Sequence, residues 1–145
     1  MATIATATMR RSGSGFGPLQ IAITILVAAT ALVHLSLGAG MAMVLMGPAG
    51  QAAAMGGATM VAILAVLFFC NFGGYVALGV ALYLPALRRF QRAIRIGLIG
   101  YTALTFVAYF AVAQGHALNL FGLSDKVVEA ALIALLVIEG RRARA

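Results

Sequence analysis

The sequence contains very little of two things that most soluble domains have, charged side chains and cysteine. Only 9% of its 145 residues are charged, and only 3 are acidic, whereas charged residues make up about 25% of an ordinary soluble domain. Cys70 is the single cysteine, which excludes an internal disulfide and a multi-cysteine metal site. A chain this short and this poor in charge leaves no room for a soluble enzyme domain.

Hydrophobic residues take the place of the missing charges. They make up 63% of the chain, and the mean hydropathy is +1.07. They gather in four apolar segments, 18–46, 59–84, 90–113 and 124–139. Since a helix needs about 20 apolar residues to cross a bilayer, we predict an all-α, antiparallel four-helix transmembrane bundle over residues 18–139. A disordered cytoplasmic tail, 1–17, is expected before it and a basic cytoplasmic tail, 140–145, after it.

Proline, glycine and small polar residues mark the expected helix ends. Pro48 and Pro85 predict where the first two helices stop, because proline interrupts a helix. Ser124 or Asp125 is expected to cap the start of the last helix. Gly140 is expected to end it.

The arginines predict how the chain crosses the membrane. They precede the first segment, separate the second from the third and follow the fourth: Arg10, Arg11, Arg88, Arg89, Arg92, Arg95, Arg141, Arg142 and Arg144. With four spans, all of them lie on one side. Because short loops rich in arginine stay in the cytoplasm, we predict a multi-pass inner-membrane protein with both chain ends inside the cell.

Polar residues near the middle of the segments predict an internal polar layer. These residues are His34, Asn71, Tyr75, Tyr101 and Thr105. Polar groups at membrane depth usually face the interior of a helix bundle. We therefore predict a midplane polar layer that contains His34 and Asn71 together with one or more of Tyr75, Tyr101 and Thr105. Asn71 and Tyr75 are four residues apart and share one helical face.

His34 has two interpretations that the sequence leaves open. One is function, as an axial ligand to haem or chlorophyll or as a proton-relay group. The other is a neutral histidine bonded to Asn71, a tyrosine or a backbone carbonyl. His116 falls in the predicted outer loop, so it cannot be a second haem ligand at the depth of His34.

The acidic residues lie in the last predicted helix. Asp125 and Glu129, four residues apart with Lys126 between them, form either a proton or cation site near the outer surface or a capped helix start with a Lys126–Glu129 pair. Glu139 is expected to pair with the arginines that follow it. The sequence predicts no metal site.

A basic cluster precedes the third predicted helix. Arg88, Arg92 and Arg95 have the spacing of one helical face, and Arg89 lies beside them. Basic residues next to a membrane helix hold anionic lipid headgroups. The alternative is that these arginines set topology alone.

Small residues at four-residue spacing predict tight packing of the first two helices. One stripe contains Thr30, His34, Gly38 and Ala42, and the facing one contains Gly73, Ala77 and Ala81. Close packing of these helices is expected to bring His34 near Asn71.

Three stretches, LVHLSLG, NFGGYVALGVALYLP and LSDKVVEAALIALLVIEG, carry a resemblance. The chain resembles small uncharacterised four-span membrane proteins of bacteria and archaea, a likeness that implies no activity. It differs from small multidrug-resistance pumps, which need a glutamate in their first helix, and from disulfide-generating four-span enzymes, which need cysteine pairs.

The expected function is non-enzymatic, as a structural or accessory subunit of a larger membrane complex or as a homo-oligomer. The alternatives are a haem- or chlorophyll-binding subunit that uses His34, and a small proton-coupled transporter. The expected partners are the lipid bilayer, with anionic lipids at the cytoplasmic face, and other membrane subunits. Nucleic acid is not expected, because the net charge of +7 comes from arginines at helix ends.

Overall fold

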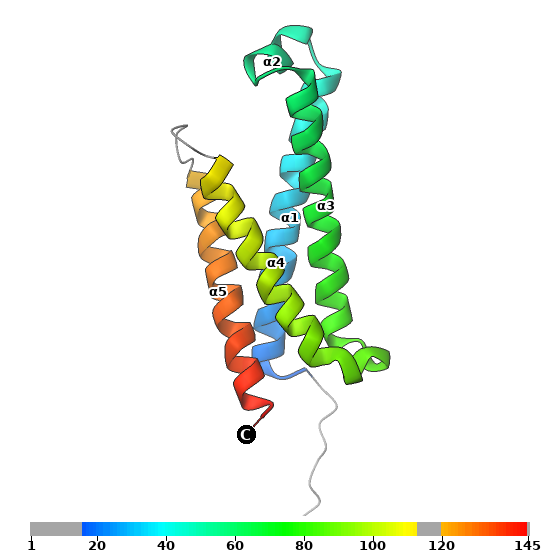
Figure 1. The fold of residues 1–145 in the computed structure, drawn as a ribbon, viewed down its shortest axis with the longest axis vertical. Coiled ribbons are helices and arrows are strands. Elements are labelled where there is room, and N and C mark those ends of the chain that lie inside the picture. The colour runs from blue at the N-terminus through cyan, green and yellow to red at the C-terminus, as the bar shows by residue number, and fades with distance from the viewer. Residues whose placement is uncertain (1–15, 113–119, 145) are drawn as a thin grey trace, which may run out of the picture.

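The computed structural model describes residues 16–112 and 120–144, and its secondary structure there is entirely helical (Figure 1). The elements are α1 (Pro18–Met46), α2 (Ala49–Ala54), α3 (Ala58–Tyr83), the 3-10 helix η1 (Pro85–Phe90), α4 (Gln91–Val112) and α5 (Leu120–Arg142). The all-α prediction is confirmed. Arg10, Arg11 and His116 lie outside the described residues, as does most of the predicted tail 1–17.

Within residues 16–112 and 120–144, three helical segments are long and apolar enough to cross a membrane. They are Pro18–Met46, Ala58–Tyr83 and Pro85–Ala111, the last of which combines η1 with most of α4. These segments indicate a multi-pass membrane protein. The fourth predicted span differs, because α5 has 23 residues but carries acidic and basic side chains that lower its hydropathy.

The helix boundaries agree with the prolines but not with the predicted ends of the last helix. Helix α1 stops just before Gly47 and Pro48, and Pro85 begins η1 after α3. The predicted cap at Ser124 or Asp125 is wrong, because α5 begins at Leu120 and the apolar residues there extend the helix by a turn. The end predicted at Gly140 is also wrong, since α5 continues to Arg142.

Helices α1 and α3 form a hairpin with the most extensive helix–helix contact of the described residues. The chain reverses direction through α2 and through Gly56 and Gly57, whose φ angles of 92° and 98° lie in the left-handed region that favours glycine. On α1, the predicted stripe is buried at Thr30, His34 and Gly38.

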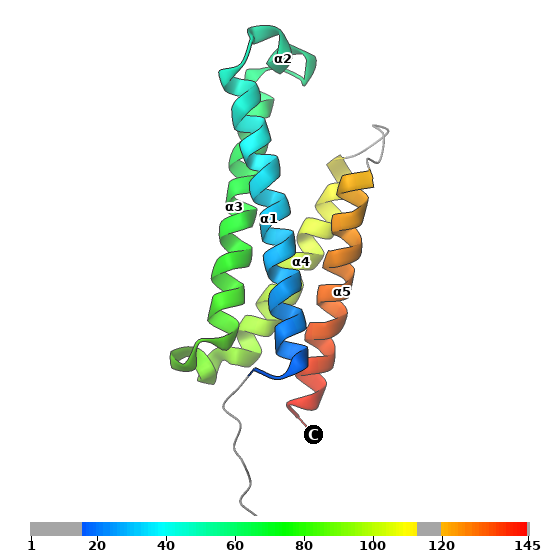
Figure 2. The same cartoon turned by 180° about the vertical axis from the view of Figure 1, so that it is seen from behind.

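The other two long helices complete a ring of neighbours. Helix α1 lies between α3 and α5, and α4 contacts α3 and α5 from the other side (Figure 2). The α1–α3 hairpin extends past the α4–α5 pair at the end that carries α2, while the start of α1, η1 and the end of α5 share the opposite end (Figure 1). The core between the helices contains Ile23, Val27, Ala31, Tyr75, Leu82, Leu98, Leu132 and Leu136.

Two glycines of α3 allow close approach, and they are not those of the predicted stripe. A Cβ at Gly79 would lie 2.6 Å from Cγ1 of Val27 on α1. A Cβ at Gly74 would overlap the ring and hydroxyl of Tyr101 on α4. Gly73 and Ala77 are exposed, so the prediction that they form the contact with α1 is wrong.

The distribution of polarity is the reverse of that in a soluble protein. Large apolar side chains face outward, with Leu32, Leu104 and Val127 more than 60% exposed. All three acidic residues, Asp125, Glu129 and Glu139, are buried among the helices. Apolar side chains outside and charged ones inside suit a lipid solvent, in which ionisable groups face the interior of the protein.

Candidate functional site

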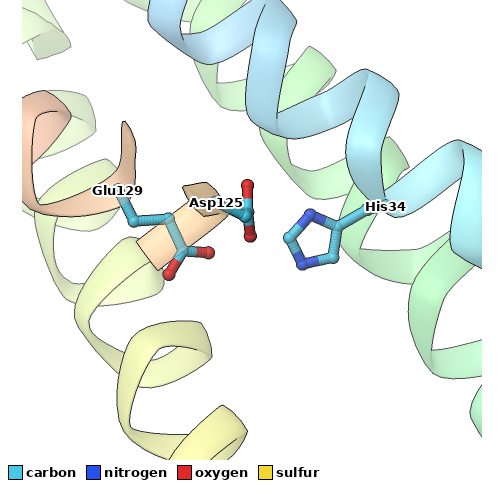
Figure 3. Close-up of side chains that lie close together, drawn as sticks. All are labelled: His34, Asp125 and Glu129. Atoms are coloured by element: carbon cyan, nitrogen blue, oxygen red, sulfur yellow. The ribbon is translucent and has the colours of Figure 1, made fainter. Parts of the chain in front are cut away.

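A buried charged cluster lies where α1 and α5 face each other. Asp125, Lys126 and Glu129 come from the first half of α5, and His34 comes from α1. The side chains of His34, Asp125 and Glu129 point toward one another across the space between the two helices (Figure 3). Each of the four residues is at most 5% exposed.

Glu129 is the most enclosed member of the cluster, with an exposed fraction of 0%. Its Oε2 accepts a hydrogen bond from Nζ of Lys126 at 2.6 Å. Its Oε1 lies 2.9 Å from the hydroxyl of Thr105 on α4 and 3.1 Å from the hydroxyl of Tyr75 on α3. One carboxylate thus connects three helices, and both of its oxygens have donors.

Asp125 connects α5 to α1. Its Oδ1 accepts a 2.6 Å hydrogen bond from the hydroxyl of Thr30, and its Oδ2 lies 3.2 Å from Nζ of Lys126. Short bonds of this kind are typical of a charged acceptor. Lys126 therefore lies between two carboxylates, which accounts for a buried ammonium group.

The hydrogen bond of His34 determines which ring nitrogen carries hydrogen. Nδ1 lies 2.9 Å from the backbone carbonyl of Thr30, and a carbonyl can only accept, so Nδ1 is the donor. The ring packs against Phe68 and Tyr75, with centroids 6.0 and 5.4 Å away. In the neutral ring, Nε2 is therefore the nitrogen that carries the lone pair.

The charges of the cluster do not sum to zero when His34 is neutral. Asp125 and Glu129 contribute two negative charges, and Lys126 contributes one positive charge. One negative charge is left without a compensating cation. An uncompensated charge is costly where the dielectric is low, and one bound cation would balance the cluster.

Hydroxyl groups beside Glu129 form a chain that can reverse its direction. The Tyr75 hydroxyl lies 2.7 Å from that of Thr105, which also lies 2.9 Å from the carbonyl of Thr102. While Glu129 is ionised, both hydroxyls can donate toward it. If Glu129 gains a proton, Thr105 can turn its hydrogen to Thr102 and accept instead, so the site can hold either protonation state without an unsatisfied group.

A metal ion is a second chemical possibility at the same place. One ligand atom each from His34, Asp125 and Glu129 lie within 4.8 Å of one another, and imidazole with carboxylates is a donor set for divalent transition metals. Nζ of Lys126 already contacts both carboxylates. A metal ion would therefore have to compete with this ammonium group, which makes a proton the simpler occupant.

The structure divides the predicted polar layer in two. Tyr75 and Thr105 join the charged cluster. Asn71 instead accepts a 3.0 Å hydrogen bond from the hydroxyl of Tyr101, whose ring packs edge-on against Tyr75 with centroids 5.2 Å apart. His34 bonds the backbone carbonyl rather than Asn71, which is one of the alternatives that the sequence left open.

The predicted basic cluster is divided as well. Arg88, Arg89 and Arg92 are exposed near the start of α4. Arg95 is buried, and its Nε donates to Oε2 of Glu139 at 3.0 Å. The hydroxyl of Tyr83 on α3 donates to the other oxygen of Glu139 at 3.1 Å, so the expectation that Glu139 pairs with the arginines that follow it is not what the structure has.

No model of a known protein family matches this chain, and neither a curated protein nor a solved structure is significantly similar to it. Function therefore has to be inferred from the site itself, because a fold alone does not define an activity.

Proposed function

We propose that the protein crosses the inner membrane four times, with both chain ends in the cytoplasm, and that its buried charged cluster binds and releases a proton as the coupling site of a small carrier. The observation that carries this proposal is the convergence of His34, Asp125, Lys126 and Glu129 with one negative charge in excess. Ionisable residues at membrane depth commonly belong to proton relays and transport pathways.

The burial of its charges supports a transmembrane position for α5. Asp125, Lys126, Glu129 and Glu139 are all turned toward the other helices. The outward side chains include Val127, which is exposed and apolar. A helix of 23 residues is about 35 Å long, enough for the hydrocarbon core, so α5 can cross with its charges shielded.

The distribution of the described arginines supports the orientation. Those near η1 and those at the end of α5 lie at the end where α1 begins (Figure 1). The opposite end carries α2, whose sequence AGQAAA has no charged residue. By the positive-inside rule, the arginine-bearing end is cytoplasmic.

The proton-binding proposal can be tested without knowing the transported substrate. Proteoliposomes adsorbed on a solid-supported membrane are exposed to a pH jump, and the transient current is recorded. If protons move part of the way across the membrane to reach the cluster, the wild-type protein gives a capacitive current. Glu129→Gln and His34→Gln should each reduce this charge displacement at least severalfold.

Glu139→Gln is the matched control, because it makes the same chemical change as Glu129→Gln at a buried carboxylate that pairs with Arg95 outside the cluster. Its current should equal that of the wild type. A wild-type protein without a transient current, or variants at His34 and Glu129 with currents as large as the control, would overturn the proposal. Circular dichroism and gel filtration of each variant show whether a lost current comes from a lost fold.

Two other functions, an accessory subunit and a haem- or chlorophyll-binding subunit, have less support. An accessory subunit needs a partner on its outer face, yet the exposed hydroxyls of Thr24 and Ser36 on α1 bond their own helix carbonyls and so suit plain lipid contact. Haem or chlorophyll ligation requires His34 to reach a macrocycle, whereas this ring is 4% exposed and faces two carboxylates. Co-purification and an absorption spectrum test these alternatives.

A further inference from the structure

A groove of about 430 Å³ lies between the start of α4 and the end of α5. Its charged lining is entirely basic and consists of Arg88, Arg89, Arg92, Arg95, Arg141 and Arg144. The buried Arg95 is neutralised by Glu139. The other five arginines are exposed and have no ion pair with any residue that the structure describes, so the groove has a large excess of positive charge.

The two walls of the groove come from segments that are far apart in the sequence. Arg88, Arg89 and Arg92 belong to η1 and α4, whereas Arg141 and Arg144 belong to the end of α5 and the residues just after it. The guanidinium group of Arg89 lies 4.5 Å from the centroid of the Phe90 ring. Planar guanidinium groups on both walls suit a phosphate, which they can bind by paired hydrogen bonds.

The inner part of the groove is apolar. Ile96 and Ile99 of α4 and Val137 of α5 line it. Ile99 lies seven residues beyond Arg92, about 10 Å further along the helix. The groove therefore has a basic mouth at the membrane surface and an apolar stretch that runs toward the hydrocarbon core.

We propose that this groove binds an anionic phospholipid, with its phosphate among Arg88, Arg92 and Arg141 and an acyl chain along Ile96, Ile99 and Val137. Charge complementarity selects an anion, and the apolar stretch selects one with a hydrocarbon chain. Basic pockets between transmembrane helices on the cytoplasmic side hold such headgroups. The site depends on the orientation of the helices in the membrane and not on the proton-binding cluster.

Arg141 and Arg142 provide a matched pair of variants. They are neighbours at the same helix end, and both are exposed, but only Arg141 lines the groove. Delipidated protein in zwitterionic detergent is titrated with phosphatidylglycerol, and binding is followed by native mass spectrometry. Each basic residue near a membrane contributes about 1 kcal/mol, so Arg141→Gln should weaken binding about fivefold, and Arg142→Gln less than twofold.

Two further titrations identify the ligand. Phosphatidylcholine should bind much more weakly than phosphatidylglycerol, because it has no net charge for the arginines to neutralise. Inorganic phosphate at the same concentration should not displace the lipid, because it lacks the acyl chain. Equal losses for Arg141→Gln and Arg142→Gln, equal binding of the two lipids, or displacement by phosphate alone would each overturn the proposal. Both substitutions are at exposed positions, so unchanged melting temperatures in detergent should confirm that the fold is intact.

Discussion

Removal of Lys126 should destabilise the protein far more than removal of Glu129, although the two residues form one ion pair. The reason is the charge balance of the cluster. Lys126→Met leaves Asp125 and Glu129 buried with no cation, since Nζ lies 3.2 and 2.6 Å from their oxygens. Glu129→Gln leaves a balanced Asp125–Lys126 pair.

The loss of stability in each variant depends on which charged or polar group the substitution leaves without a partner. Removing one partner of a buried ion pair costs about 3–5 kcal/mol, so Lys126→Met should shift the unfolding equilibrium by at least about a hundredfold. In Glu129→Gln, the amide oxygen can still accept from Thr105 and Tyr75, while the amide nitrogen meets the ammonium group. One such mismatch costs about 1–3 kcal/mol.

The double variant Lys126→Met/Glu129→Gln gives the decisive comparison. Once Lys126 is absent, replacing Glu129 with glutamine removes one of two carboxylates that repel each other. The new amide also no longer faces the ammonium group of Lys126. The double variant should therefore be more stable than the sum of the single effects, by about 2–3 kcal/mol, near the upper end of measured coupling energies. Unfolding in mixed micelles with increasing dodecyl sulfate, followed by circular dichroism, measures all four proteins.

Additive effects, within about 0.5 kcal/mol, would show that the three charges do not share one low-dielectric site. A Lys126→Met variant as stable as Glu129→Gln would refute the charge balance itself. In either case the excess negative charge, on which the proton-binding proposal depends, would not exist.

Three further predictions concern packing, the second ion pair and topology. Gly79→Leu should lower the free energy of unfolding by about 1–3 kcal/mol through overpacking, because its Cβ would lie 2.6 Å from the facing valine of α1. Gly73→Leu is the control and should be tolerated, because a Cβ there has nothing within 4 Å. Unfolding of both variants in mixed micelles measures the difference. Tyr83→Phe removes a 3.1 Å bond to a glutamate that keeps its arginine, so a loss of about 0.6 kcal/mol is expected, and a loss of several kcal/mol would contradict this. With the native cysteine replaced by serine, Gln51→Cys should react with a membrane-impermeant maleimide in intact cells and Arg144→Cys should not, and the reverse pattern would invert the proposed topology.

The helices could be predicted from the sequence because their signals are local. Long apolar segments and the prolines at positions 48 and 85 locate α1 and α3 closely. Capping chemistry predicts a helix start at Ser124 or Asp125, whereas α5 begins at Leu120. The polar side chains here do not end the helix, since they are satisfied by groups on neighbouring helices.

The charged cluster could not be predicted, because it depends on how far each helix extends from a common end. Distance from the middle of each predicted helix places His34 at the centre of the membrane and Asp125 near the outer surface. Counted from the arginine-bearing end, His34 is 16 residues along α1 and Glu129 is 13 residues along α5, or about 24 and 20 Å. The α1–α3 hairpin is longer than the α4–α5 pair (Figure 1), so the middle of α1 faces the first turns of α5.

The described residues form two buried ionic networks, and the difference in their net charge distinguishes helix adhesion from a functional role. Arg95, Glu139 and Tyr83 join α3, α4 and α5 through a neutral pair, and a neutral pair is enough to hold helices together. The cluster around Glu129 also joins helices, but with His34 neutral it has one negative charge in excess, which adhesion does not require and which lowers stability. A site that is destabilising in one protonation state and has balanced charge in the other is suited to change its protonation state during function. The Arg95–Glu139 pair is thus an internal reference: replacing both of its members with neutral residues should alter stability and leave the pH-jump current of the folded protein in place.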